Sequence, residues 1–137
     1  YTTARKAAIG TNLEIINSSA LGKINKYFPD PKYSEYMTYY FTNNSGHFKL
    51  NYVDLPSELI RDYRLTLDYE EDLKMLGEIE WYFQENKIDY NIKELFRFLD
   101  NHPEITRINQ ECLTMYLSDT ALIDALNKET RIVKEVI

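Results

Sequence analysis

A change of hydrophobic period at Asp68 constrains the fold of this chain more than any other feature. Residues 62–68 alternate between apolar and polar side chains, which is the pattern of a half-buried strand. From residue 70 to about residue 85 the apolar positions recur every three or four residues, which is the pattern of an amphipathic helix. A strand that passes directly into a helix is a building unit of α/β folds, so the sequence predicts that class.

The same two periods predict the other elements of the chain. Alternation predicts strands at about residues 10–16 and 47–53, and helical spacing predicts helices at about residues 18–28, 33–41 and 92–99. Stretches rich in proline, asparagine and glycine separate these segments, at residues 29–31, 43–46 and 102–103. Because three strands are few for so many helices, we expect a small, incomplete sheet flanked by several helices.

The composition narrows the class of protein. With 137 residues the chain fits one compact domain, and no apolar run is long enough to span a bilayer. A charged N-region followed by an apolar stretch is missing, so we expect no secretory signal. The single cysteine, Cys112, excludes an internal disulfide framework, and the net charge of -6 makes duplex nucleic acid a poor partner. We therefore expect a cytoplasmic protein without nucleic-acid or membrane partners.

The block RLTLDYEEDL, residues 64–73, is the part of the sequence that points to chemistry. Ligands of open α/β sheets bind at the carboxyl ends of strands, where Asp68 is expected to lie. Arg64 and Thr66 share its side of the predicted strand. A carboxylate there can hold Mg²⁺ that carries phosphates, because Mg²⁺ takes one or two protein carboxylates and completes its shell with water and phosphate oxygens. Arg64 would suit an anionic oxygen of the ligand.

A structural role of Asp68 explains the same block. Aspartate is a favoured N-cap, and Asp68 with Glu71 resembles a capping box in front of an apolar helix. Asp72 then only complements the positive end of the helix dipole. The block by itself leaves a metal ligand and a helix cap as alternatives.

Three stretches, taken in order, resemble the C-terminal half of the CTP-dependent sugar cytidylyltransferases of the spore-coat-polysaccharide and acylneuraminate type. IGTNLEI is similar to the family's strand of glycine, spacer and glutamate, and YSEYMTYYF is similar to its Glu-His-Val-Thr-Pro-Tyr segment. RLTLDYEEDL is similar to its Arg-x-Thr-x-Asp-x-x-Glu-Asp-Leu block. The resemblance covers about residues 8–110. The matching residues are Gly10, Glu14, Glu35, Thr38, Arg64, Thr66, Asp68, Glu71, Asp72 and Leu73.

This resemblance implies the C-terminal part of a Rossmann-like nucleotidyltransferase fold. Residues 1–117 would form that portion, and residues 118–137 a C-terminal helix that serves as a dimerisation arm or begins a further segment. The implied reaction transfers CMP from CTP to an acidic or surface-polysaccharide sugar, releases pyrophosphate and uses Mg²⁺ as cofactor. Asp68 would be the metal ligand and Arg64 the catalytic anion contact. The substrate contacts would be Glu14, Glu35, Thr38 and Thr66.

Two departures from the family pattern change what the resemblance implies. Tyr36 and Tyr39 stand where the family has histidine and proline, so we expect a different sugar pocket. The family's N-terminal half, with its nucleotide-binding loop and a second metal-binding aspartate, has no counterpart in these residues. We therefore expect the full-length parent to be the enzyme and this piece alone to be inactive.

A non-catalytic interaction or dimerisation module is the alternative interpretation. One face of the predicted C-terminal helix is apolar and must be covered by this domain, a second copy or another chain; it comprises Leu122, Leu126, Val133 and Ile137. An incomplete sheet also exposes a strand edge, which favours pairing with another copy. We therefore expect a homodimer.

Overall fold

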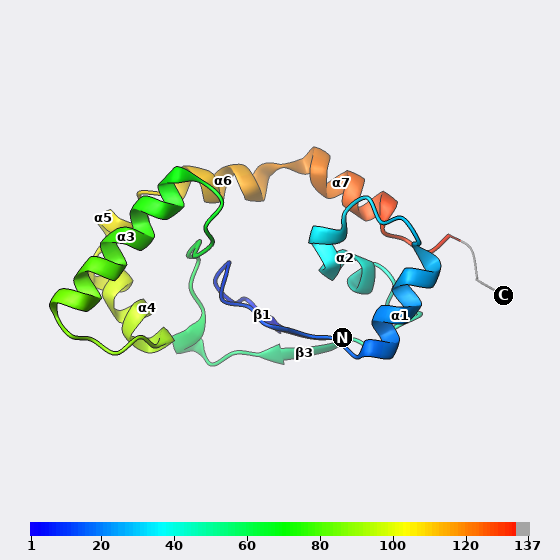
Figure 1. Cartoon of the computed structure of the whole chain (residues 1–137), viewed down its shortest axis with the longest axis horizontal. Helices are drawn as coiled ribbons and strands as arrows, with labels where there is room; N and C mark the ends of the chain where they lie inside the picture. The colour runs from blue at the N-terminus through cyan, green and yellow to red at the C-terminus, as the bar shows by residue number, and fades with distance from the viewer. Residues whose placement is uncertain (134–137) are drawn as a thin grey trace. The chain divides into compact units, whose positions relative to one another are not determined.

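The computed structural model describes residues 1–133, which belong to two compact units (Figure 1). Unit 1 comprises residues 1–3, residues 13–53 and the chain from Asp119 onward, and unit 2 comprises residues 4–12 and 54–118. The described residues contain seven α-helices and one three-stranded sheet, so the expected α/β class with a small sheet and several helices is confirmed. None of the helices within this range is both long and apolar enough to cross a membrane.

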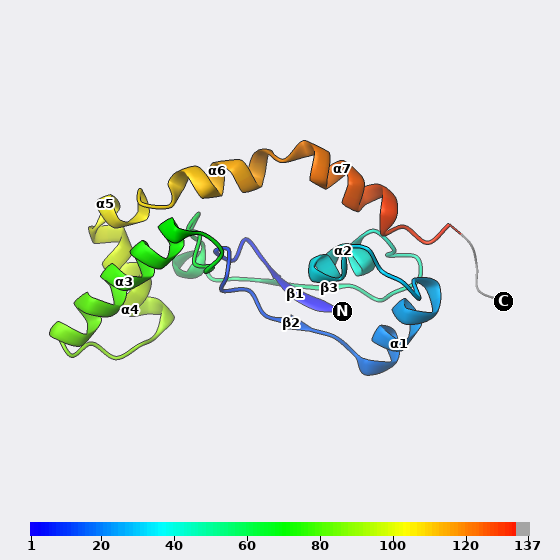
Figure 2. The same ribbon diagram turned by 45° about the horizontal axis from the view of Figure 1, so that its top comes forward.

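Unit 1 combines most residues of a small sheet with an aromatic core. Strand β1 (Thr2–Arg5) lies between β2 (Glu14–Ile15) and β3 (Asn51–Asp54), and β1 pairs with β2 in antiparallel orientation (Figure 2). The helical elements are α1 (Ser18–Tyr27), the 3-10 turn η1 (Ser34–Tyr36), α2 (Met37–Thr42) and α7 (Thr120–Glu129). The buried core consists of Tyr1, Ile24, Tyr40, Phe41 and Phe48.

Side-chain hydrogen bonds fix the helix ends of unit 1. Asn17 caps α1, and its Oδ1 accepts from the Ser19 amide at 2.9 Å. At the end of α7 the buried Thr130 donates its hydroxyl to the Leu126 carbonyl at 2.8 Å. Asn44 holds the following residues, because its side chain donates to the Thr130 carbonyl and accepts from the Ile132 amide. These bonds end α7 at Glu129.

The apolar stripe predicted over residues 118–137 is therefore shorter than expected. Leu126 is buried and Leu122 is partly buried in α7, whereas Val133 is exposed beyond the end of the helix. Ile137, the last member of the stripe, lies outside the described residues. Within residues 1–133 the buried part of the stripe is thus confined to α7.

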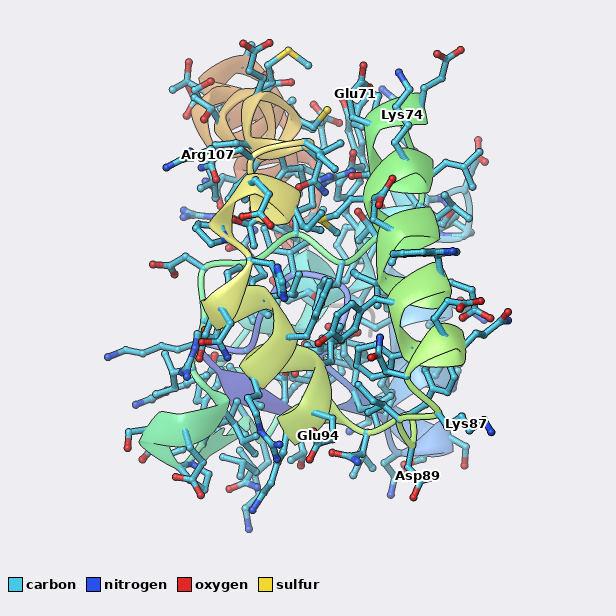
Figure 3. All side chains as sticks on the ribbon, turned by 90° about the vertical axis from the view of Figure 1, so that its left-hand side faces the viewer. Glu71, Lys74, Lys87, Asp89, Glu94 and Arg107 are labelled. Atoms are coloured by element: carbon cyan, nitrogen blue, oxygen red, sulfur yellow. The ribbon has the colours of Figure 1, made fainter. Side chains whose placement is uncertain are left out.

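Unit 2 is organised by a pair of helices. Helix α3 (Glu70–Glu85) and helix α4 (Ile92–Asn101) lie side by side, and Lys74, Lys87 and Asp89 point away from the pair (Figure 3). The buried core of the unit consists of Met75, Ile79, Phe83, Phe98 and Leu99. The remaining helical elements are η2 (Ser57–Leu59), α5 (Pro103–Thr106) and α6 (Gln110–Ser118).

The two helices predicted for this unit are confirmed. Helix α3 has the predicted bounds, and α4 begins at the predicted residue. The side chain of Asn91 caps α4 by accepting from the amides of Lys93 and Glu94 at 3.1 and 3.0 Å. Helix α4 ends before His102 and Pro103, where the sequence predicts the break.

The predicted strands are only partly correct. Residues 62–68 form one bridge in place of a strand, in which Arg64 pairs with Ile9 in parallel orientation. The strand predicted at 10–16 shrinks to Glu14–Ile15, and the one predicted at 47–53 shifts to Asn51–Asp54. Strand β1 and helix α6 are not anticipated by the sequence patterns. Alternation indicates an extended backbone, but a strand also needs a partner, which the local pattern does not contain.

Candidate functional site

A buried ion pair between Arg64 and Asp72 forms the centre of the candidate site. Arg64 is 4% exposed and Asp72 is 0% exposed. The guanidinium donates from Nε to Asp72 Oδ1 at 3.1 Å and from Nη2 to Asp72 Oδ2 at 3.2 Å. The side-chain amide of Asn109 donates to the same Oδ1 at 2.8 Å and to the Arg64 carbonyl at 2.9 Å. These hydrogen bonds offset the cost of burying the two charges.

Asp72 is also the residue that caps helix α3. Its Oδ2 accepts from the amides of Asp68 at 3.0 Å and Tyr69 at 3.2 Å, and Tyr69 occupies the N-cap position. Burial alone would raise the pKa of Asp72, but hydrogen bonds from Arg64, Asn109 and the two amides outweigh burial and lower it. The carboxylate is therefore ionised and fully committed to the fold. Asp68 is not the N-cap that the sequence offered, because Tyr69 occupies that position and the carboxylate that accepts from the backbone there is that of Asp72.

Asp68 lies on the outer side of the same cluster. Its Oδ2 accepts from Arg64 Nη2 at 2.7 Å, and its side chain remains 61% exposed. Arg64 thus holds two carboxylates, of which one is enclosed and the other is accessible. The structure confirms that Arg64 and Asp68 lie together, as their shared side of the extended segment predicts.

The residues around Asp68 suit a cation that brings most of its own ligands. Within residues 1–133 there is no group of three or more histidine, cysteine, aspartate or glutamate side chains that could hold a metal ion. A single exposed carboxylate fits Mg²⁺, which usually keeps several waters and binds substrate phosphates. Asp68 would be the residue that holds such an ion. Asp72 has no such role, because its oxygens bind Arg64, Asn109 and two amides.

Thr66 and Gly10 have surroundings that differ from those expected of ligand contacts. The Thr66 hydroxyl is buried and has no hydrogen-bond partner among the described residues. Gly10 has a φ of +92°, and a Cβ at this position would lie 2.5 Å from the Leu65 carbonyl oxygen. Gly10 therefore allows the backbone beside the Ile9–Arg64 bridge to pass close to the extended segment.

A second group of predicted residues meets in unit 1. Glu14 Oε1 accepts from the Tyr1 hydroxyl at 2.6 Å and also from the Thr38 hydroxyl. Burial, and then the hydrogen bond to Glu14, raise the pKa of the Tyr1 phenol. Glu35 is exposed in η1 and has no hydrogen-bond or ion-pair partner among the described residues. The structure thus brings Glu14 and Thr38 together and leaves Glu35 outside this contact.

Sequence reasoning missed three residues around Arg64. Asn109 follows α5 and gives no local signal, although it binds both members of the buried pair. Tyr69 and Tyr116 lie against the guanidinium, with Arg64 Cζ 5.2 Å from the first ring centre and 5.8 Å from the second. Tyr69 lies inside the block of residues 64–73, so the sequence contains a signal for it. Tyr116 belongs to α6, which the sequence patterns did not predict.

An apolar groove of about 650 Å³ lies elsewhere in unit 2. Helix α3, the start of α4 and the segments around Gly10 and Leu65 line it, and Leu73 on its wall is 60% exposed. None of Arg64, Thr66 or Asp68 lines this groove. Its chemistry is that of a surface that packs against another apolar surface.

Comparison with known proteins yields one informative relative. The chain is 31% identical over 110 residues to an uncharacterized protein of Methanocaldococcus jannaschii, MJ1063. The aligned region covers 80% of this chain and 44% of the relative, so the chain spans less than half of that protein's length. No protein-family model matches the chain. No solved structure matches it.

Proposed function

We propose that this chain works as the C-terminal, sugar-side part of a longer CTP-dependent sugar cytidylyltransferase. The observation that carries the proposal is the different use of two carboxylates by Arg64. Asp72 is buried and caps α3, so the cap role no longer competes for Asp68, whose carboxylate is exposed. The resemblance of three stretches supplies the reaction: CMP passes from CTP to an acidic or surface-polysaccharide sugar. The proposed enzyme is cytoplasmic and homodimeric.

In the proposed reaction a sugar hydroxyl oxygen bonds to the α-phosphorus of CTP. The bond between that phosphorus and the oxygen bridging to the β-phosphate breaks, pyrophosphate leaves, and the hydroxyl proton passes to solvent. Mg²⁺, when bound, would neutralise charge on the triphosphate and the leaving group. Asp68 would hold the ion, so its exposed carboxylate would fix where the triphosphate sits.

Arg64 would act as a positioning residue. Its guanidinium is buried and already bonded to two carboxylates, which leaves it little freedom to follow a phosphate. By holding one oxygen of Asp68, Arg64 would restrict the motion of that carboxylate before a ligand binds. This role replaces the direct anion contact that the resemblance implies.

Three of the residues that the resemblance matches to substrate contacts, Glu14, Glu35 and Thr38, lie in unit 1. Glu14 and Thr38 already share a hydrogen bond and would exchange it for, or add to it, bonds to sugar hydroxyls. Glu35 is a further exposed carboxylate that would accept from a hydroxyl. These residues would govern the choice of sugar, whereas Asp68 would govern transfer. Thr66, whose hydroxyl is buried, would contact substrate only after a rearrangement.

The activity test uses a longer protein that contains this chain. It is incubated with CTP, Mg²⁺ and a panel of neutral and acidic sugars, and CMP-sugar and pyrophosphate are quantified. We expect equal amounts of the two products with at least one sugar, dependence on CTP over ATP, and loss of product when EDTA removes Mg²⁺. Absence of CMP-sugar across the panel would contradict the proposal. A reading frame upstream of Tyr1 that encodes a glycine-rich loop with arginine and lysine would support it.

An interaction module is the second candidate, and the apolar groove of unit 2 favours it. Leu73 on the wall of this apolar groove is exposed, and Trp81 on the same helix is exposed as well. Under this alternative the chain associates through the groove and Asp68 has no catalytic part. Light scattering of the chain and of a Leu73→Asp variant tests the association. A dimer that Leu73→Asp dissociates would identify the groove as an interface, and it would favour the module only if the longer protein makes no CMP-sugar. A monomer in both cases would count against the module.

A further inference from the structure

The two tyrosine rings beside Arg64 form an exposed pair that the proposed reaction does not use. Tyr69 comes from the start of α3 and Tyr116 from α6, both within unit 2. Their ring centres lie 5.2 and 5.8 Å from Arg64 Cζ, and each residue is 47% exposed. A guanidinium at this distance is attracted to the face of an aromatic ring, so Arg64 holds both rings near Asp68. We call these two rings the tyrosine pair.

The exposure of the tyrosine pair is not required by the buried ion pair that it covers. Each tyrosine remains 47% exposed, although the guanidinium is already bonded to Asp72 and Asp68. Leu67 and Leu117, which adjoin Asp68 and Tyr116 in the sequence, are also exposed. Exposed aromatic rings beside an accessible carboxylate are candidates for a binding surface.

The charges of this surface limit the ligand that it can take. Arg64 contributes one positive charge, whereas Asp68 and Asp72 contribute two negative charges, so the cluster does not attract an uncomplexed anion. Tyrosine rings stack on flat or weakly polar ring faces, and the exposed Asp68 carboxylate accepts from hydroxyl or amino groups. The surface therefore suits an uncharged ring that carries hydrogen-bond donors.

We infer that the tyrosine pair binds such a ring by stacking, with Asp68 as the hydrogen-bond acceptor at its edge. A nucleobase and a sugar ring share this chemistry. The inference rests on the proposed function only in the choice of these two sources. It adds Tyr69 and Tyr116 as residues that would position one of the reactants at the carboxylate.

The test uses the complete 137-residue chain and two uncharged probes, cytidine and methyl β-glucoside, without Mg²⁺. Binding is measured by NMR titration for the unmodified chain and for Tyr116→Leu, which keeps an apolar cover over Arg64 but removes the aromatic face. Tyr116→Phe keeps the ring and should bind like the unmodified chain. Tyr90→Leu is the matched control, because Tyr90 is an exposed tyrosine of unit 2 that is bonded to Glu80 instead of Arg64.

We expect one probe to bind and Tyr116→Leu to weaken it about fivefold or more, the range of a lost stacking contact. Tyr90→Leu should leave the affinity unchanged. Binding of cytidine identifies the nucleobase as the source, and binding of the glucoside identifies the sugar. Binding of neither probe, or equal loss in Tyr116→Leu and Tyr90→Leu, would overturn the inference. If Tyr116→Leu does not fold, intermolecular NOEs between the probe and the rings of Tyr69 and Tyr116 in the unmodified chain test the inference. Absence of these NOEs would overturn the inference.

This experiment separates the inference from the proposed function. If a ring binds the tyrosine pair but the longer protein makes no CMP-sugar, the binding surface is supported and the proposed reaction is excluded. CMP-sugar formation with an unchanged KM for both substrates in Tyr116→Leu would retain the reaction and remove the surface.

Discussion

Two of the arginine–aspartate pairs of unit 2, Arg64–Asp72 and Arg61–Asp100, begin three residues apart and differ in burial. Arg64 and Asp72 have side chains that are 3% and 0% exposed, whereas Arg61 and Asp100 have side chains that are 29% and 38% exposed. The outer pair has the shorter contact, 2.7 Å between Arg61 Nη2 and Asp100 Oδ2, yet water screens it. We therefore expect burial, more than distance, to decide how strongly the fold depends on an ion pair.

The inner pair also explains why a third carboxylate is left over. Arg64 requires Asp72 for neutralisation inside the protein, and α3 requires Asp72 as its cap. Asp68 is needed for neither purpose and remains exposed beside them. A buried inner carboxylate and an exposed outer one, both held by Arg64, provide a rigid support for ligand chemistry. The following variants test these different roles of the carboxylates, in order of decreasing expected change in stability.

Asp72→Asn should cause the largest loss of stability. It leaves the Arg64 charge enclosed with one exposed partner, and breaking a buried pair in this way costs about 3–5 kcal/mol. Urea denaturation monitored by circular dichroism measures the free energy of unfolding. Asp62→Asn, at an exposed position of the same segment, is the control and should change it by no more than about 0.5 kcal/mol. Equal effects of the two variants would show that Asp72 is not a structural residue.

Asp100→Asn should cost much less than Asp72→Asn. The exposed pair with Arg61 is screened by water, and the asparagine oxygen can still accept from Arg61 and from the Tyr63 hydroxyl. We expect a loss of no more than about 1 kcal/mol in the same denaturation assay. A loss as large as that of Asp72→Asn would contradict the role assigned to burial.

Acid should weaken the protein through the same carboxylates. The hydrogen bond from Arg61 lowers the pKa of Asp100 to about 2, and the pKa of Asp72 is also lowered. Both lie below the value of about 3.9 in an unfolded chain, so their stabilisation is present above that pH and is lost as pH falls through the folded pKa. We expect Tm to be level above about pH 5 and to fall between about pH 4 and pH 2. Asp100→Asn should reduce this fall, and an unchanged fall would exclude Asp100 as a cause.

Asp68→Asn should have the smallest effect on stability. Its side chain is exposed, it caps no helix, and its contact with Arg64 can persist through the amide oxygen. We expect a change within about 0.5 kcal/mol in the denaturation assay. A loss of about 1 kcal/mol, the usual cost of a missing cap, would return Asp68 to the structural role that the sequence offered.

The sequence predicts helices α1, α3 and α4 well because their information is local, whereas it does not predict α6. The apolar spacing over residues 70–85 lies within one element and is correct. The strands are predicted poorly, because the bridge of Arg64 depends on Ile9, which lies far away in the sequence. An alternating pattern cannot show which distant segment supplies the partner.

The candidate site divides in the same way. The alternation over residues 64–68 predicts that Arg64 and Asp68 share one side, and the structure confirms their contact. The buried contact of Asp72 with Arg64 is not predicted. The choice of Asp72 over Asp68 as helix cap could not be predicted, because it depends on Asn109, whose amide bonds the same carboxylate from 37 residues further along the chain. Both acids fit a helix N-terminus equally well in the sequence alone.

The assignment of Asp68 to ligand chemistry and of Asp72 to the fold rests on the different exposure of their side chains. Its most direct test is the rate of CMP-sugar formation by a longer protein that contains this chain, compared between Asp68→Asn and Asp89→Asn, an exposed aspartate of the α3–α4 loop (Figure 3). We predict that Asp68→Asn lowers kcat about a hundredfold or more at unchanged Tm, and that Asp89→Asn changes neither. Equal rates for the two variants, or a loss of rate that follows a loss of Tm, would contradict the assignment.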